Sequence, residues 1–470
     1  MATRLLRVPR LAAAVALVAA AVCLSGYAQT AKSDSVSSYL PISRRIAMAA
    51  LLGNEALSNL HVLCHSVGHR LSGSPGEAKA IPWAVDALKR AGCDRVTTEP
   101  VAVPTWSRGH TSVKLLTPVI EDLPALALGG SVGTTSGPIE ADVVVARSFN
   151  DLERLGKLGI QGKIVVYDVP WDGYGKTVRF RSDGASRAAE YGAVAVLTRS
   201  AGFGGTRTPH TGAMTYADGV AKIPAAALAF EDAGRIGKYA SAGVAVRMRI
   251  DLGCRTSADS MGANVIGDYF GSDRPDEIVL LGAHLDSWDV GHGAQDDGGG
   301  VVSVIEAVAV LKRLGLRPRR TIRVVLFANE ENGLRGARAY AAAHAPTMKL
   351  HVAAIENDGG VEKPVGFGMN FPKGTLATDP RAVAFRDIVG LLEPLGAANA
   401  AMEGGGADIG QLGPYGVPLM SINTVGSRYF EWHHTELDTF DKIVPSELDK
   451  HVAVHSIMAF VLADMTTTLR

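Results

Sequence analysis

The pattern of hydrophobic and polar positions divides the chain into three parts. Up to about residue 118, apolar residues recur at helical spacing in 46–64 and 77–92, and short strand-like runs follow. From about residue 119, turns containing Pro and Gly separate short helices, such as 184–190, from short Val/Ala/Ile runs. These runs predict strands at 141–146, 163–169, 193–197, 223–229 and 244–250. The middle part therefore reads as a small β-rich module, which ends at a polar joint at 257–260.

From Asn264 onward, predicted strands and helices alternate. Near-continuous apolar runs, typical of buried parallel strands, occur at 277–283, 321–328, 350–355 and 417–422. Helical patterns lie between or after them at 299–314, 333–345, 380–392 and 446–466. This order predicts the α/β class, with a mixed, mostly parallel sheet sandwiched by helices. In such sheets the ligand site lies outside the carboxyl ends of the strands.

Length and charge narrow the classes of function. A chain of 470 residues suits two or three domains. Lys+Arg and Asp+Glu balance at 47 each, and no basic tract is interleaved with aromatic residues. We therefore expect no nucleic-acid binding.

The first 28 residues have the pattern of a signal peptide. Arg4, Arg7 and Arg10 precede the apolar run 11–24, and small residues flank Tyr27 before the expected cleavage point. The run is shorter than the roughly 20 residues that a membrane span requires. No later stretch is long and apolar enough, so the pattern predicts export, periplasmic or secreted, without a membrane span.

Three cysteines would remain after cleavage: Cys64, Cys93 and Cys254. They allow at most one intramolecular disulfide, and no pair has CxxC spacing. Buried small hydrophobic side chains are the simplest interpretation.

Polar residues of metal-binding type follow the first predicted strand of the last part. His284 and Asp286 are two residues apart and would share a face of an extended chain. A carboxylate beside a His is the arrangement that selects the tautomer of a metal-binding imidazole. The glycine-rich segment 293–300 follows and would let the chain fold back, which brings Asp296 toward His284.

Three more clusters lie further along. Glu330 and Glu331 follow the next apolar strand, and two adjacent carboxylates facing each other need a cation or a proton. A cation could bind one of them while the other takes a proton from water. Asp358 follows the third strand, and the pair His433-His434 follows Tyr429-Phe430.

Ligands with nitrogen and oxygen but no thiolate favour zinc, with manganese or cobalt as substitutes. One His and one carboxylate for each ion, joined by a bridging carboxylate, would make a two-metal site. Each cluster alone has a plainer explanation, such as a helix cap, a turn or a solvated pair. Four such clusters, most of them at the end of an apolar strand, favour the metal site.

These residues resemble the zinc aminopeptidase and glutamate carboxypeptidase family of co-catalytic metallopeptidases. The likeness covers most of the chain after the signal peptide and rests on the segments 284–291, 293–300 and 315–318. It extends to a subgroup with an inserted protease-associated domain. The implied division is a signal peptide at 1–28, a first peptidase part at 29–118, the protease-associated insert at 119–255 and the catalytic part at 256–470.

The resemblance also implies a role for each residue of the site. His284 and Asp358 would bind one Zn²⁺, Glu331 and His434 the second, and Asp296 would bridge the two. Glu330 would be the general base that activates the bridging water, and Asp286 would support His284. The peptide bond after the bridging residue, Asp296-Asp297, is cis in this family. The choice of His434 over His433 rests on the ending His-Thr-x-x-Asp-Thr.

The resemblance leads to three candidate functions. The first is a two-zinc exopeptidase that hydrolyses dipeptides or short peptides with free termini. The second is a single-zinc glutaminyl cyclase, which the complete set of ligands for two metals disfavours. The third is a receptor-like binding protein without catalysis, which would have lost ligands or the base. Peptide is the expected partner, and the resemblance suggests a homodimer.

A few further residues could contact a substrate. Arg179, Arg181, Tyr191 and Arg207 of the insert could reach the site, although a solvated surface role is the simpler expectation. In the relatives, the glycine-rich loop that ends at Asp408 lies near the site, and Asp408 could instead cap a helix.

Overall fold

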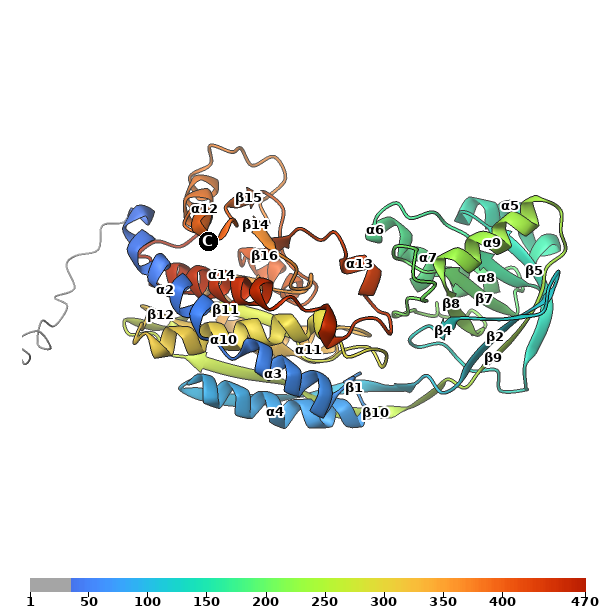
Figure 1. Cartoon of the computed structure of the whole chain (residues 1–470), viewed down its shortest axis with the longest axis horizontal. Helices are drawn as coiled ribbons and strands as arrows, with labels where there is room; N and C mark the ends of the chain where they lie inside the picture. The colour runs from blue at the N-terminus through green and yellow to red at the C-terminus, as the bar shows by residue number, and fades with distance from the viewer. Residues whose placement is uncertain (1–34) are drawn as a thin grey trace, which may run out of the picture.

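The computed structural model describes residues 35–470, so the predicted signal peptide lies outside the described residues. Two lobes, each built on an eight-stranded sheet, lie side by side (Figure 1). We call residues 35–107 and 255–470 the main lobe, and residues 111–252 the inserted lobe.

The sheet of the main lobe confirms the predicted α/β architecture. Its four central strands, in the order β12-β11-β13-β16, are parallel. Strand β10 pairs antiparallel with β1 and β12, and β14 pairs antiparallel with β16 but parallel with β15. The full order is β1 (Arg95–Ser107), β10 (Arg255–Tyr269), β12 (Arg320–Phe327), β11 (Arg274–His284), β13 (His351–Glu356), β16 (Leu419–Thr424), β14 (Pro364–Met369) and β15 (Asn399–Ala401).

Helices cover both faces of this sheet. Val279 and Leu281 of β11 belong to the same core cluster as α10 and α14, whereas Leu280 packs in a second cluster with Tyr340 of α11 on the opposite face. Successive residues of a strand point to opposite faces, so the continuous apolar run of β11 is what a doubly covered sheet requires. The helices of this lobe are α2 (Leu40–Leu52), α3 (Ala56–Val62), α4 (Pro75–Ala91), α10 (Gly299–Arg313), α11 (Arg335–His344), α12 (Pro380–Gly390), α13 (Tyr429–Trp432) and α14 (Pro445–Asp464).

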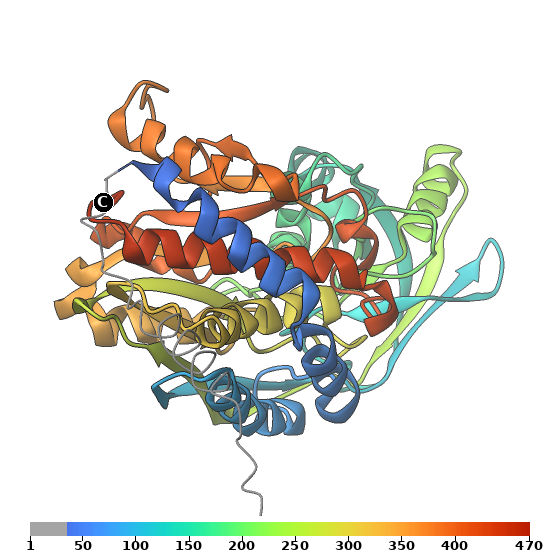
Figure 2. The ribbon, with the colours of Figure 1, turned by 60° about the vertical axis from the view of Figure 1, so that its left-hand side comes forward.

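The helix predicted at 46–64 is broken in the structure. Helix α2 ends at Leu52 and α3 begins at Ala56, and both lie near α14 in the main lobe (Figure 2). The Asn54 side chain accepts a hydrogen bond from the Ala56 nitrogen at 2.9 Å and donates one to the Ala50 carbonyl at 2.8 Å. An Asn that bonds to nearby backbone groups competes with helix continuation, which explains the break.

The inserted lobe has a sheet of its own, as the middle part of the sequence predicts. Its order is β3 (Glu121–Leu123), β2 (Thr111–Thr117), β9 (Arg247–Leu252), β5 (Ile139–Ala146), β6 (Ile164–Tyr167), β7 (Ala195–Arg199), β8 (Ala225–Leu228) and β4 (Ala125–Ala127). Its helices are α5 (Phe149–Ile160), α6 (Tyr174–Thr177), α7 (Arg179–Ser182), α8 (Gly184–Ala189) and α9 (Phe230–Ser241). Strand β2 pairs with β9, so this sheet begins at Thr111, before the boundary predicted at residue 119.

Two long antiparallel strands, β1 and β10, run from the main lobe toward the inserted lobe (Figure 1). The polar segment 257–260, predicted as a joint, lies inside β10 and pairs with β1, for example Ser260 with Val103. Its polar side chains are mostly exposed because this part of the ribbon lies outside the helix layers. The connection between the lobes is therefore a paired ribbon and has no loop at this point.

Two further predictions concern cysteines and membrane spans. Within residues 35–470, Cys64, Cys93 and Cys254 are free thiols, and burial raises their pKa to about 12, 12 and 11, respectively. No single described helix has the length and hydropathy of a membrane span, although the bent pair 36–52 and 56–67 passes that test jointly.

Candidate functional site

The five residues predicted to bind metal come together at one edge of the main-lobe sheet. His284 ends β11, Glu331 follows β12 and Asp358 follows β13, and these three strands are parallel neighbours. Asp296 lies in the turn η3 (Ala294–Gly298) that precedes α10, and His434 follows the short helix α13. Carboxyl ends of adjacent parallel strands meet at the same sheet edge, which is why residues so distant in sequence converge.

Asp296 lies between two His–carboxylate pairs. Its Oδ1 is 3.1 Å from Nε2 of His284, and that nitrogen is 3.3 Å from Oδ1 of Asp358. Its Oδ2 is 3.3 Å from Nε2 of His434, and that nitrogen is 3.1 Å from Oε2 of Glu331. Each oxygen of one carboxylate therefore serves a different pair, and Asp296 occupies the position of a bridge.

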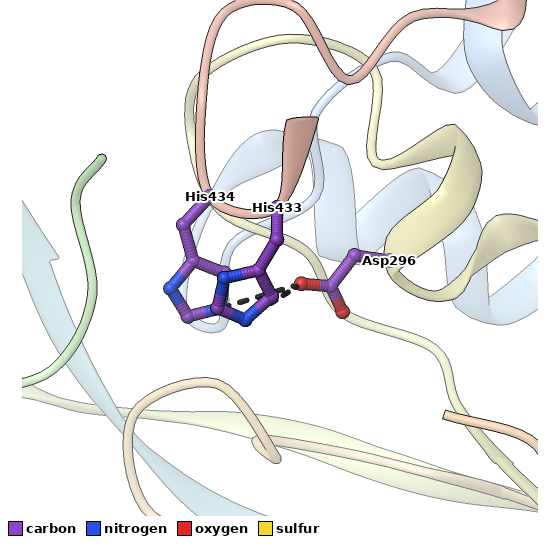
Figure 3. A group of neighbouring side chains, drawn as sticks. All are labelled: Asp296, His433 and His434. Carbon is purple, nitrogen blue, oxygen red and sulfur yellow. Dashed lines mark ion pairs between the residues drawn. The ribbon is translucent and has the colours of Figure 1, made fainter. Parts of the chain in front are cut away.

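His433 and His434 both approach Asp296, and their rings stack with centroids 3.6 Å apart (Figure 3). Nε2 of His433 is 3.7 Å from Oδ2 of Asp296, farther than Nε2 of His434. His434 also faces Glu331, whereas His433 packs against Tyr174 and Phe430. Burial lowers the pKa of His433 well below its usual value, and so does the neighbouring His434.

The geometry and charge of this cluster fit divalent metal ions. Two ligands bound at about 2.0–2.1 Å at a tetrahedral angle lie about 3.3 Å apart, close to the nitrogen–oxygen distances of 3.1–3.3 Å found here. Oδ2 of Asp296 is buried and accepts no well-aligned hydrogen bond from residues 35–470. Burial raises the pKa of Asp358 and raises that of Glu331 to about 7, and the negative charge of Asp296 acts in the same direction on both.

The group that orients the His284 ring is not the Asp286 carboxylate, which the sequence predicted, but the Asp286 backbone carbonyl. Nδ1 of His284 lies 3.0 Å from the backbone oxygen of Asp286 and 3.9 Å from the Asp286 carboxylate. Strand β11 ends at His284, so the extended geometry that would align the two side chains does not continue. A main-chain carbonyl therefore fixes the imidazole with Nε2 toward Asp296.

The Asp286 carboxylate instead orients the segment that carries Glu330 and Glu331. Oδ1 accepts a hydrogen bond from the Glu330 nitrogen at 2.9 Å, and Oδ2 accepts bonds from the Glu331 nitrogen at 3.4 Å and the Ser72 hydroxyl at 3.1 Å. The Asp286 side chain is buried. It acts on the site through the backbone of its neighbours.

Glu330 lines the cavity beside the metal-type cluster. Burial raises its pKa well above the usual value, and the nearby carboxylates of Asp358, Glu331 and Asp286 act in the same direction. A carboxylate with a raised pKa, close to the reacting centre and outside the ligand set, has the chemistry of a general base.

The Asp296–Asp297 peptide bond is cis, as the resemblance implies. The Asp297 carboxylate accepts hydrogen bonds from the His284 nitrogen and from the Gly300 nitrogen, both at 3.1 Å. Asp297 thus joins the end of β11 to the start of α10.

The inserted lobe contributes one wall of a cavity of about 280 Å³ over this cluster. Tyr174 and Arg181 come from that lobe, and Ala407, Tyr429 and Phe430 come from the main lobe. Arg181 is buried, its Nη2 donates to the Tyr174 hydroxyl at 2.8 Å, and its Nη1 donates to the Thr211 carbonyl at 3.2 Å. Within residues 35–470, no carboxylate pairs with this guanidinium.

Of the other residues considered from the sequence, Arg179, Tyr191 and Arg207 lie away from the cluster, whereas Asp408 lies near it. Burial raises the pKa of Asp408 well above its usual value, and the charges of Glu356 and Glu330 act in the same direction. Arg207 pairs with Asp232 and Glu121, and Arg179 is exposed beside the ring of Phe149. Tyr191 packs against the core of the inserted lobe. Asp408 is buried beside Glu356, which accepts its backbone N–H at 3.2 Å, and it makes no side-chain cap.

Sequence reasoning did not identify Tyr174, Thr211 or Trp288 as parts of the site. The Trp288 backbone nitrogen donates to Oε1 of Glu331 at 3.2 Å, and the Thr211 carbonyl lies 3.2 Å from Nδ1 of His434. Trp288 lies within the motif 284–291, and its position between the motif's polar residues could have indicated that it belongs to the site. Tyr174 and Thr211 belong to the inserted lobe and carry no local signal.

Comparison with known proteins places these residues in a family. The sequence profile of "Peptidase family M28" matches residues 264–459. Carboxypeptidase Q of Mus musculus is 37% identical over 93% of this chain and 92% of its own length, and that of Homo sapiens is 36% identical over 96% and 95%. A crystal structure of a peptidase M28 precursor from Shewanella amazonensis SB2B superposes with a TM-score of 0.87 and 38% identity, covering 93% of this chain and 99% of that one. These matches confirm the resemblance inferred from the motifs.

Proposed function

This chain belongs to peptidase family M28, and from that premise we propose that it is a two-zinc exopeptidase that hydrolyses dipeptides or short peptides with free termini. The family and the carboxypeptidase Q relatives make it a metallopeptidase. The number of metal ions, the mechanism and the substrate are the parts that we propose.

The position of Asp296 is the observation that carries the proposal. His284 and Asp358 would hold one zinc ion, Glu331 and His434 would hold the second, and the two oxygens of Asp296 would serve both. When bound, zinc polarises the carbonyl of a peptide bond and lowers the pKa of water to about 7.

Glu330 supplies the proton transfers in this proposal. It takes a proton from the water that attacks the peptide carbonyl, and a carbon–oxygen bond forms. As the carbon–nitrogen bond breaks, Glu330 gives that proton to the amine of the leaving residue. The hydrogen bond from the Glu330 nitrogen to Asp286 holds the base in place during both steps.

The cavity supports a short substrate. About 280 Å³ is near the lower end of ligand-pocket volumes, which suits one or two residues better than a long peptide. The buried Arg181 guanidinium, without a carboxylate partner within residues 35–470, suits the free carboxylate of such a substrate. Tyr174, Tyr429 and Phe430 would contact its apolar parts.

The experiment is a measurement of metal content and dipeptide hydrolysis for the wild type and Glu330→Gln. We expect two zinc ions per chain in both, with kcat lower by about 10²–10⁴-fold in the variant. One zinc ion with cyclisation of N-terminal glutamine would favour the cyclase. A chain without metal and without turnover would contradict the peptidase proposal.

We also propose export after removal of residues 1–28, a protease-associated identity for the inserted lobe, and a homodimer. The signal-peptide pattern supports the first of these and the resemblance supports the other two. Mass spectrometry of the exported protein would locate the new N-terminus, and light scattering would give the number of chains per particle.

A further inference from the structure

We propose that the inserted lobe is a structural part of one of the two metal positions: it holds Glu331 and His434 in place, and it leaves His284 and Asp358 to the main lobe. This inference rests on the proposed two-zinc function. It assigns to Trp288, Gly129, Thr211 and Arg108 the role of positioning residues.

His434 is held by the backbone of Thr211. The Thr211 N–H donates to the His434 carbonyl at 2.9 Å, and the Thr211 carbonyl lies 3.2 Å from Nδ1 of His434. Nη1 of Arg181, also of the inserted lobe, lies 3.3 Å from the same nitrogen. A His434 that bound zinc through Nε2 would carry its proton on Nδ1 and would donate it to the Thr211 carbonyl, so the inserted lobe supplies the acceptor for the metal-binding tautomer.

The backbone of His434 needs this support. Its φ is +61°, in the left-handed region, which is unfavourable for a residue with a side chain. Such a conformation persists where surrounding contacts determine it. The reciprocal bonds with Thr211 are contacts of that kind.

Glu331 is linked to the inserted lobe through Trp288. The Trp288 backbone nitrogen donates to Oε1 of Glu331 at 3.2 Å, and its ring lies edge-on to the His434 ring, with centroids 5.7 Å apart. The same ring is buried within the core cluster of the inserted lobe. Gly129 leaves the space for it, since a Cβ at this position would lie 2.0 Å from the Trp288 ring.

An ion pair between Arg108 and Asp289 lies where the two lobes meet, which we call the lobe junction. Nε of Arg108 donates to the Asp289 carboxylate at 3.0 Å, directly after Trp288 in the chain, and Nη1 donates to the Thr211 hydroxyl at 2.9 Å. Arg108 therefore fixes the Trp288 segment and the Thr211 segment against each other. Because each segment contacts one metal-type ligand, a shift of the junction moves Glu331 and His434 together.

The other pair of predicted ligands, His284 and Asp358, is not held by the inserted lobe. His284 is held by the Asp286 carbonyl and the Asp297 carboxylate, both in the main lobe. Asp358 directly follows β13 in the central sheet. A disturbance of the lobe junction should therefore weaken one metal position and spare the other.

The test is zinc retention by the full chain against graded concentrations of a chelator, for the wild type and Gly129→Ala. The added methyl meets the Trp288 ring and touches neither the cavity nor any predicted ligand. We expect one of the two zinc ions to be lost at about 10- to 100-fold lower chelator strength, the usual effect of losing support for a metal ligand. Replacement of zinc by Co²⁺ should show a changed visible absorption for one ion only.

Gly175→Ala is the matched control. Gly175 lies in the same lobe as Gly129, and a Cβ at this position would have no atom within 4 Å. It should retain both ions as the wild type does. Asp289→Asn is the second variant if Gly129→Ala does not fold, and it should weaken the same single position. Equal weakening of both ions, or unchanged affinities in a folded variant, would overturn the inference while the two-zinc proposal stands. A wild type that binds one zinc ion would overturn both.

Discussion

The carboxylate of Asp438 lies 3.1 Å from the backbone nitrogen of Asp296, and it ties the segment that carries His434 to the proposed bridging ligand. The same carboxylate accepts hydrogen bonds from the nitrogens of Ala294 at 3.0 Å and Gln295 at 2.7 Å. Three N–H groups on one buried carboxylate fix the turn before α10.

Asp438→Asn should therefore weaken metal binding. The NH2 group that replaces one oxygen cannot accept a hydrogen bond, so at least one of the three N–H groups loses its acceptor and the turn that carries Asp296 is held less firmly. We expect zinc affinity to fall by about 10- to 100-fold, measured by chelator competition. Asp441→Asn, at an exposed acid three residues on, is the control and should bind zinc as the wild type does.

Arg181 should determine the preference for a free carboxylate. Arg181→Gln keeps a polar side chain but removes the charge, so hydrolysis of a dipeptide should fall by about 30- to 1000-fold in kcat/KM, the effect of about 2–4 kcal/mol. Hydrolysis of the same dipeptide as its C-terminal amide should change little.

Arg179→Gln changes an exposed Arg of the same short helix and is the control for this prediction. An equal loss with both substrates in Arg181→Gln would show that Arg181 supports the site in general, and would contradict carboxylate recognition.

Removal of the metal should destabilise the folded chain. The carboxylates of Asp296, Glu331 and Asp358 would then face one another without neutralisation. A ligand at a thousand times its Kd stabilises by about 4 kcal/mol, so chelation should lower Tm by several degrees and zinc should restore it. Glu331→Gln should show a smaller response to zinc; a response as large as that of the wild type would argue against Glu331 as a ligand.

Stability should fall in mild acid because of two buried histidines on α14. Burial lowers the pKa of His451 to about 4 and that of His455 to about 3. Between these values and the usual 6.5, the unfolded chain binds protons that the folded chain excludes, so stability rises with pH in this window. At pH 5, each His should cost about 2 kcal/mol relative to pH 7.5.

The measurement is urea unfolding at both pH values for the wild type and His455→Leu. The variant removes one of the two groups, so its loss of stability between pH 7.5 and pH 5 should be smaller by about 2 kcal/mol. The same loss in both proteins would show that His455 titrates normally in the folded chain.

The predicted ligands illustrate what a sequence can specify about such a site. His284, Glu331 and Asp358 follow apolar runs that form parallel neighbouring strands, so order along the chain was enough to place them at one sheet edge. The cis bond after Asp296 was expected from the family resemblance. Local predictions were less accurate at 46–64, where the Asn54 side chain interrupts a helical pattern.

The wall of the cavity that the inserted lobe contributes depends on contacts between segments that are distant in the sequence. Arg181 and Thr211 approach His434 from the inserted lobe, more than two hundred residues earlier in the chain. Likewise, strand β2 joins the sheet of the inserted lobe through its pairing with β9, which lies more than a hundred residues later in the chain.

The sequence by itself determined the α/β class of the main lobe, because periodicity and strand order are local properties of the chain. Its motifs, through the family resemblance, also named the candidate metal ligands that the fold brings together. The tertiary structure decided that Asp286 supports Glu330 and Glu331 through their backbone, that His434 is oriented by Thr211, and that Arg181 lines the cavity. The first of these depends on how two segments of the main lobe pack together, and the other two depend on how the two lobes meet. Hydrophobic periodicity within one segment carries no information about which distant backbone group lies opposite it.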